Sequence, residues 1–216
     1  MRITRYDSGL LCSSTYVVQE GEHALVIDPG RPVPLPEGLQ VDKLLITHEH
    51  YDHIFGVNRW KEETGAPLLC SEAAARRITS STINQARYFP AFCQMQSYSA
   101  QWDEDLIDAA YTTCAEESFS DSLDMEWQGH RLRLVELPGH SPGSIGIYID
   151  DTDFFSGDSI LEHHEVELRF PGGSRQAWEA RSEKIIRDLP EGIRIWPGHY
   201  DGFVWHRREA QTNSEK

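Results

Sequence analysis

Residues 48–53 read His-Glu-His-Tyr-Asp-His (HEHYDH), and they directly follow the apolar run Leu-Leu-Ile-Thr. Three imidazoles and one carboxylate within six residues are four potential ligands for a metal ion. A strand that runs into a loop can present every second residue on one side, so that His48, His50 and Asp52 converge. His53 adds a further ligand beside them, and the spacing is compatible with two metal ions.

Three more potential ligands stand where predicted strands end. His140 follows the alternating segment 131–137, Asp158 follows the apolar pair at 154–155, and His199 follows the segment 193–196. A glycine precedes each of these ligands and permits a close backbone turn. Because no cysteine is present among these ligands, the site leaves room for water, which indicates a catalytic rather than a structural metal site.

Strands and helices are predicted in both halves of the chain. Short alternating or apolar runs predict strands at 16–18, 24–27, 43–47, 131–135, 144–149, 154–156 and 193–196. Helical spacing is found at 54–64, which stops at Gly65, and at 176–189. The pattern favours a layered α/β architecture in a single domain, 1–216, with a mostly helical insertion around 71–128. That insertion is acidic: nine carboxylates fall between Asp103 and Glu126, and no Lys or Arg occurs from Tyr88 to His130.

The charge balance narrows the range of partners. Thirty-five acidic against twenty basic residues give a formal net charge of −15, which disfavours binding to nucleic acid or to anionic lipid. No apolar segment is long enough to span a bilayer, and the first residues lack the continuous apolar region of a signal peptide. The four scattered cysteines resemble small buried hydrophobic residues, so we expect a cytoplasmic location. The partner that we expect is a small-molecule substrate.

These motifs resemble the metallo-β-lactamase fold superfamily. The resemblance extends over nearly the whole chain, through DPG (28–30), HEHYDH (48–53), PGHSPGS (138–144), SGDS (156–159) and WPGHYDG (196–202). It implies a four-layer αββα sandwich with a dinuclear metal site. Carried over by motif, His48, His50 and His140 would bind the first metal, Asp52, His53 and His199 the second, and Asp158 would bridge the two.

The resemblance also implies a branch of the family. The classical antibiotic-hydrolysing group most often has cysteine where Asp158 stands, whereas the PGHSPGS run and a bridging aspartate are typical of glyoxalase II-type thioesterases, related lactonases and persulfide dioxygenases. Lactonases commonly carry a tyrosine shortly after the bridging aspartate, and this chain has Ser159-Ile160-Leu161. Seventeen residues follow His199, so we expect the helical region that carries glutathione contacts in glyoxalase II to be absent.

The expected function is that of a glyoxalase II-like dinuclear hydrolase, which cleaves a thioester or activated ester by metal-bound hydroxide. Asp52 is the candidate catalytic residue, because it can orient the hydroxide and carry a proton to the leaving group. Zinc is the expected metal, with iron and manganese as alternatives. The alternatives are a mononuclear iron persulfide dioxygenase, a lactonase, a nuclease that the charge disfavours, and a metal-binding scaffold without turnover.

The motifs say little about the residues that surround the metal ligands or contact the substrate. Asp28 is a candidate to hold a ligand imidazole, with Thr47 and Ser141 as weaker candidates, although Asp-Pro-Gly is also a turn in its own right. His163 and His164 are considered as additional ligands. The predicted substrate wall consists of Tyr88, Phe89, Phe92, Met95, Tyr98, His163 and Arg175. His23, His130 and His206 are expected to be structural or solvated.

Overall fold

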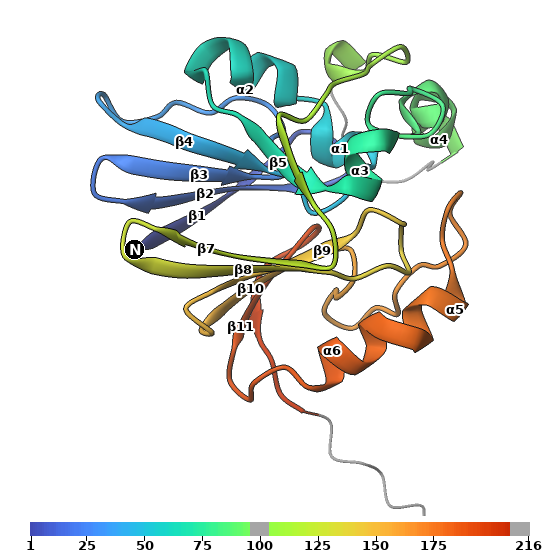
Figure 1. Ribbon diagram of the computed structural model, residues 1–216. Coiled ribbons are helices and arrows are strands. Elements are labelled where there is room, and N and C mark those ends of the chain that lie inside the picture. The colour runs from blue at the N-terminus through green and yellow to red at the C-terminus, as the bar shows by residue number, and fades with distance from the viewer. Residues whose placement is uncertain (96–103, 208–216) are drawn as a thin grey trace, which may run out of the picture.

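The computed structural model describes residues 1–95 and 104–207, which form two facing sheets with helices on both outer sides (Figure 1). The first sheet has the strand order β1 (Arg2–Asp7), β2 (Ser14–Glu20), β3 (His23–Ile27), β4 (Gln40–Leu45), β5 (Leu68–Ser71) and β6 (Glu117–Phe119). The second has the order β12 (Phe203–Val204), β11 (Arg194–Pro197), β10 (Asp153–Gly157), β9 (Ile145–Ile149), β8 (His130–Glu136) and β7 (Ser122–Trp127). The predicted αββα sandwich is therefore confirmed.

The helices lie in two outer layers. The first sheet is covered by α1 (Tyr51–Ile54), α2 (Val57–Thr64), α3 (Glu72–Arg77), η1 (Ala86–Tyr88) and α4 (Phe89–Met95), and η2 (Glu104–Leu106) lies on the same side. The second sheet is covered by α5 (Arg175–Ala177), the π-helical turn η3 (Trp178–Ser182) and α6 (Glu183–Arg187). Ser71 caps α3, because its hydroxyl accepts a hydrogen bond from the Ala74 amide at 3.1 Å.

Three apolar clusters separate the four layers. Trp60 of α2 packs with Val26 and Leu44 between the first sheet and its helices. Alternate residues of the same strands, among them Ile27 and Leu45, face the second sheet and pack with its inner side chains. A third cluster lies between the second sheet and α6. The inner strands are thus apolar on both faces, as expected for sheets covered on both sides.

The topology brings the metal-ligand motifs to one edge of the sandwich. In the first sheet β3 and β4 are parallel, and in the second sheet β10 and β11 are parallel. The residues that follow parallel strands meet at the same edge of a sheet. Two hydrogen bonds join these edges across the sandwich, from the Ile145 amide to the Thr47 carbonyl at 2.8 Å and from the Ser14 amide to the Gly198 carbonyl at 2.7 Å.

Three structural predictions were wrong in detail. The described residues of the insertion at 71–128 are not mostly helical, because its acidic end forms β6 and β7, which pair with β5 and β8. The predicted helix 54–64 is divided at Gly56, which lies against the Gly30 carbonyl and leaves no room for a side chain. Cys12 and Cys114 are exposed, whereas Cys70 and Cys93 are buried as expected.

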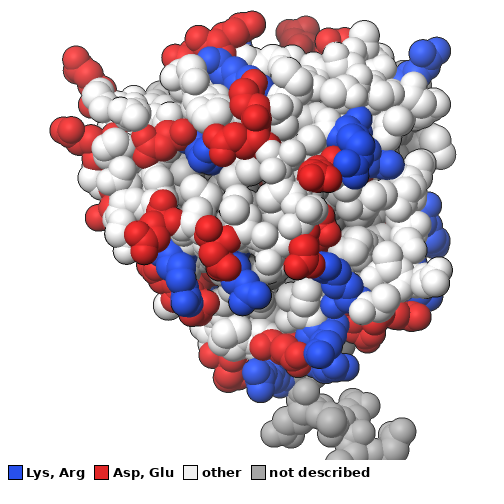
Figure 2. All heavy atoms as spheres, viewed as in Figure 1, with Lys and Arg blue, Asp and Glu red and all other residues white. Residues whose placement is uncertain are grey.

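On the face shown in Figure 2, acidic and basic side chains are interspersed rather than gathered into one basic patch. No helix within the described ranges has the length and apolar character needed to cross a membrane.

Candidate metal centre

Seven side chains meet on the loops at the edge where the two sheets are joined. They come from four segments: the β4–α2 segment gives His48, His50, Asp52 and His53, and the loops after β8, β10 and β11 give His140, Asp158 and His199. The structure thus brings together every ligand that the sequence motifs single out. His48, His53 and His140 are at most 2% exposed, so these imidazoles lie beneath the protein surface.

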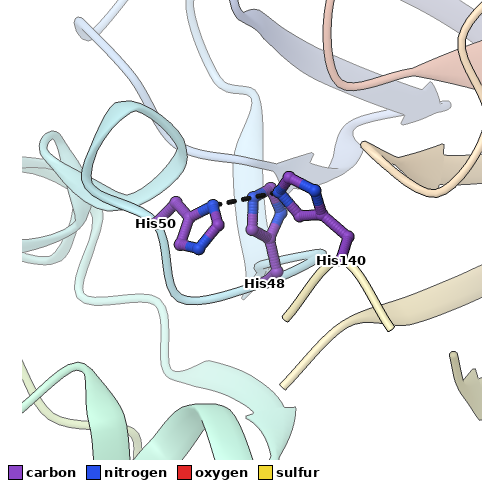
Figure 3. Close-up of side chains that lie close together, drawn as sticks. All are labelled: His48, His50 and His140. Carbon is purple, nitrogen blue, oxygen red and sulfur yellow. Dashed lines mark hydrogen bonds between the residues drawn. The ribbon is translucent and has the colours of Figure 1, made fainter. Parts of the chain in front are cut away.

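The first ligand group consists of His48, His50 and His140, which converge from two different loops (Figure 3). Nε2 of His140 lies 3.0 Å from Nδ1 of His50, and the two rings are arranged edge to face. Nε2 of His48 is buried and has no hydrogen-bond partner in the described structure. These three nitrogen atoms are placed as ligands of one metal ion would be.

The second ligand group consists of Asp52, His53 and His199, and Asp158 lies between the two groups. Nε2 of His199 is 3.4 Å from Oδ2 of Asp52 and 3.4 Å from Oδ2 of Asp158. Nε2 of His53 is 3.5 Å from Oδ1 of Asp158, and Nε2 of His140, in the first group, is 3.5 Å from its Oδ2. One carboxylate therefore faces ligands of both groups.

These separations fit the donor set of a metal site. Two ligands about 2.1 Å from one ion at a tetrahedral angle lie about 3.4 Å apart. The observed spacings of 3.4 and 3.5 Å match this value. The buried atoms His48 Nε2, His53 Nε2 and Asp158 Oδ1 have no hydrogen-bond partner, which is costly unless a cation lies between them. The residues present therefore fit a pair of divalent metal ions.

Protein acceptors fix the outer nitrogen of four imidazoles. Nδ1 of His53 donates to Asp28 Oδ2 at 3.0 Å, Nδ1 of His140 to the Glu167 carbonyl at 2.9 Å, and Nδ1 of His199 to the Leu11 carbonyl at 3.0 Å. Nδ1 of His48 contacts the Thr47 hydroxyl at 3.1 Å. When the imidazoles are neutral, as metal binding requires, these contacts favour the tautomer in which each Nε2 presents its lone pair to the cluster.

Asp28 organises this outer layer. Its Oδ1 accepts the Thr47 amide at 2.6 Å, and its Oδ2 accepts the Thr47 hydroxyl at 2.7 Å as well as His53. Because the Thr47 hydroxyl donates to Asp28, it is left to accept from Nδ1 of His48. The predicted role of Asp28 in holding an imidazole is confirmed, and Thr47 joins it. Asp28 has φ = 51°, which is a conformation that Asp tolerates better than most residues.

The cluster is electrostatically coupled. Burial together with His140 lowers the pKa of His50 to about 3. Burial opposes protonation of His53, but Asp52, Asp158 and Asp28 outweigh it and raise the pKa of His53 to about 9. Burial would raise the pKa of Asp158, yet His199 and His53 hold it well below its usual range. The carboxylates of Asp52 and Asp158 are therefore ionised, as metal ligands must be.

Glu49, which lies within HEHYDH, was not singled out from the sequence. Its side chain is completely buried, Oε1 accepts from Arg77 Nε at 2.5 Å, and Oε2 accepts from the Ser141 hydroxyl at 2.8 Å. Ser141 thus holds Glu49 instead of an imidazole, which corrects its predicted role. In the sequence, the only indication of this role is that Glu49 stands between His48 and His50.

A cavity of about 330 Å³ opens beside the cluster, and His50, Asp52, Asp158 and His199 form part of its wall. Of the predicted substrate wall, Tyr88, Phe89 and Phe92 line the cavity. Met95 and His163 are highly exposed and, like Arg175, do not line it, while Tyr98 lies outside the described residues. The cavity is also lined by Leu11, Gln85, Phe170 and Pro171, which no sequence motif singles out.

The other histidines lie apart from the cluster. His164 stacks on Tyr200, with ring centroids 5.1 Å apart, and His163 lies near Glu162. Neither belongs to a ligand group among the described residues, so the structure gives no support to the less favoured possibility that they are extra ligands. His23, His130 and His206 pair with carboxylates elsewhere, as expected for structural or solvated residues.

The αββα fold and the histidine–aspartate cluster define a protein of the metallohydrolase type. The sequence model of the metallo-beta-lactamase superfamily matches residues 9–199. The chain belongs to this superfamily, whose members bind metal ions, often two.

Two of the sequence relatives are named as hydrolases. The protein named "Probable metallo-hydrolase YqgX" of Bacillus subtilis is 21% identical over 206 residues, which cover 92% of this chain and 90% of that protein. A hydroxyacylglutathione hydrolase of Aeromonas hydrophila is 27% identical over 189 residues, which cover 85% of this chain. The match spans only 59% of the length of that hydrolase.

Solved structures share the fold. The BLEG-1 B3 metallo-beta-lactamase superposes with a TM-score of 0.78 at 20% identity, and the match covers 94% of both chains. TTHA1623 in a di-iron-bound form gives a TM-score of 0.67 at 24% identity and covers 93% of this chain and 94% of its own. ETHE1 from Myxococcus xanthus gives 0.66 at 19% identity and covers 94% of this chain and 78% of its own.

Proposed function

We propose that this protein is a dinuclear metallohydrolase that cleaves a thioester or activated ester of a small molecule. His48, His50 and His140 would bind one divalent ion, Asp52, His53 and His199 the other, and Asp158 would bridge them. The observation that supports this proposal most strongly is the position of Asp158, whose two oxygen atoms lie 3.4 to 3.5 Å from ligand nitrogens of both groups. Zinc is the proposed metal, since it accepts this set of imidazole and carboxylate ligands.

The metal ions would lower the pKa of coordinated water towards about 7 and so supply a nucleophile at neutral pH. Hydrolysis adds water across the C–S or C–O bond: the acyl carbon gains the hydroxyl group, and the departing thiol or alcohol gains a proton. Asp52 is the residue proposed to carry that proton, because its carboxylate lies in the cavity wall beside His199.

Two observations favour a thioester or ester over a β-lactam. One sequence relative is the hydroxyacylglutathione hydrolase of Aeromonas hydrophila, at 27% identity over 189 residues. The bridging position holds an aspartate, Asp158, rather than cysteine. The same ligands also accept iron, so iron-dependent oxidation of a persulfide is the outcome to be separated by experiment.

The test uses metal-free protein that is reloaded with zinc, iron or manganese and assayed with and without oxygen against a thioester, an ester, a lactone, a β-lactam and a persulfide. The proposal expects oxygen-independent release of thiol that Asp158→Asn abolishes. Asp188→Asn, at an exposed position that caps the C-terminal end of α6, is the matched control. Loss of a persulfide only in the presence of oxygen, or no turnover of the panel, would overturn the proposal.

A further inference from the structure

The cavity beside the cluster has an aromatic wall that reaches the metal-ligand imidazoles. The ring centroids of Phe89 and Phe92 are 6.2 Å apart, and those of Phe92 and Phe170 are also 6.2 Å apart. Phe170 continues this wall to His50 at 5.9 Å and to His140 at 5.8 Å. A group bonded to the carbonyl that reacts at the cluster would therefore lie against aromatic rings.

Away from the metal ligands, the described wall of this cavity offers no Lys or Arg to pair with a charged substrate arm. The backbone carbonyl of Glu167 accepts a hydrogen bond from His140, and the Glu167 carboxylate is paired with Arg169 at 2.6 Å. With a formal charge of −15 on the chain, an anionic arm would lose its hydration in this cavity without gaining an ion pair.

Gln85 adds one polar group to this apolar wall. It lines the cavity, and its Nε2 is buried with no hydrogen-bond acceptor in the described structure. Its backbone has φ = 71°, which is unfavourable for a residue other than glycine. Asn84 fixes this conformation, because its side chain donates to the Tyr111 carbonyl at 3.0 Å and accepts the Ala86 amide at 2.9 Å.

A strained residue with an unpaired buried donor costs free energy unless a ligand offsets the cost. An oxygen atom on a ligand in the adjoining cavity would supply the missing acceptor. The aromatic wall and this buried donor together describe what such a ligand must carry.

Resting on the proposed function, we infer that the acyl group of the substrate is uncharged, has an aromatic or equally bulky apolar arm, and carries an oxygen atom that accepts a hydrogen bond from Gln85. The apolar arm packs against Phe89, Phe92 and Phe170. The side-chain amide of Gln85 donates a hydrogen bond to the oxygen atom. Gln85 is thus a specificity-determining residue.

The test compares three thioesters of one uncharged thiol, N-acetylcysteamine, with the zinc-loaded protein. The phenoxyacetyl and 3-phenylpropanoyl groups are nearly isosteric and differ by an ether oxygen in place of a methylene group, while the succinyl group carries a carboxylate. Because the ether oxygen also activates the carbonyl, each kcat/KM is divided by the rate constant of the same thioester with hydroxide in water. The inference expects this ratio to be about fivefold higher for phenoxyacetyl than for 3-phenylpropanoyl, the worth of one neutral hydrogen bond, and lowest for succinyl.

Gln85→Met should abolish the difference in this ratio between the two aromatic substrates. Gln128→Met is the matched control, since Gln128 is exposed, has φ = 49° and lies in the turn between β7 and β8. Because Gln85 Nε2 has no partner, Gln85→Met should leave the thermal midpoint of the metal-free protein unchanged or higher, whereas a purely structural glutamine would lower it.

Calorimetric binding of phenoxyacetamide and 3-phenylpropanamide separates this inference from the proposed function, because it needs no turnover. If no thioester is cleaved but phenoxyacetamide binds more tightly and Gln85→Met removes the difference, the proposed reaction fails and the binding site stands. Equal cleavage of succinyl and aromatic thioesters, or a difference that survives Gln85→Met, would overturn the inference.

Discussion

Oδ2 of Asp28 lies 3.0 Å from Nδ1 of His53, and both side chains are at most 1% exposed. The pair fixes which nitrogen of His53 faces the cluster, and Asp28 also holds the loop through Thr47. A carboxylate behind a metal-binding imidazole typically raises metal affinity by 10- to 100-fold.

Asp28→Asn is therefore expected to weaken binding of the second metal ion by about 10-fold or more while the first is retained. Competition with a chromophoric chelator measures the two affinities. Asp150→Asn changes a similar aspartate–histidine pair, with His130, far from the centre and should alter neither affinity. Equal metal binding by all three proteins would show that Asp28 serves only as a turn.

Glu49→Gln is expected to lower the free energy of unfolding by about 2 kcal/mol, because it leaves Arg77 without its buried anionic partner. The glutamate also joins the loop of His48 to the loop of His140 through Ser141, so metal affinity should fall as well. Denaturant unfolding of the metal-free protein gives the first quantity. Glu72→Gln, an exposed residue paired with Arg76, should change stability by less than about 0.5 kcal/mol, and an equal effect of both substitutions would refute the assigned role.

Asp42 is expected to make stability depend on acid pH. Burial would raise its pKa, but hydrogen bonds from His23 and Trp127 and the charge of His23 lower it below the usual value. A lowered pKa in the folded state contributes stability above the unfolded pKa of about 4, and this contribution is lost as the pH falls through the lower folded pKa.

The stability difference between the natural protein and Asp42→Asn should thus be full above about pH 5 and shrink below about pH 4. Thermal melts from pH 3 to pH 7 on metal-free protein would measure it. Asp124→Asn, at an exposed position of β7, serves as control. A difference that stays constant over this range would mean that the carboxylate charge is not involved.

Gly198→Ala is expected to reduce the metal content below two ions per chain. A Cβ atom at this position would overlap Oδ1 of Asp158 and lie 2.9 Å from Cε1 of His53. Since both are side chains of the centre, the substitution displaces ligands from two groups. Elemental analysis of the metal-saturated variant checks this, and full metal content would contradict the close packing seen here.

Much of the fold and the centre could be predicted from the sequence, because both depend on local patterns. All seven ligands follow the ends of apolar strands, three of them directly after a glycine, and the parallel pairing of β3 with β4 and of β10 with β11 helps to bring them together. The alternation at 131–135 and the run at 144–149 likewise correspond to β8 and β9.

What the sequence did not predict depends on contacts between distant segments. The acidic segment after Asp103 was taken as helical, yet Glu117–Phe119 extends along β5 and Ser122–Trp127 along β8, so tertiary pairing outweighed local preference. The role of Glu49 depends on Arg77 and Ser141, which no local spacing reveals. Phe170 reaches the centre through a loop without a motif.

The most direct test of a dinuclear hydrolase is to titrate the metal-free protein with zinc under anaerobic conditions while following thioester hydrolysis. We predict that the rate rises with added zinc and saturates at two equivalents per chain. Saturation at one equivalent, or no hydrolysis at any zinc concentration, would contradict the central claim.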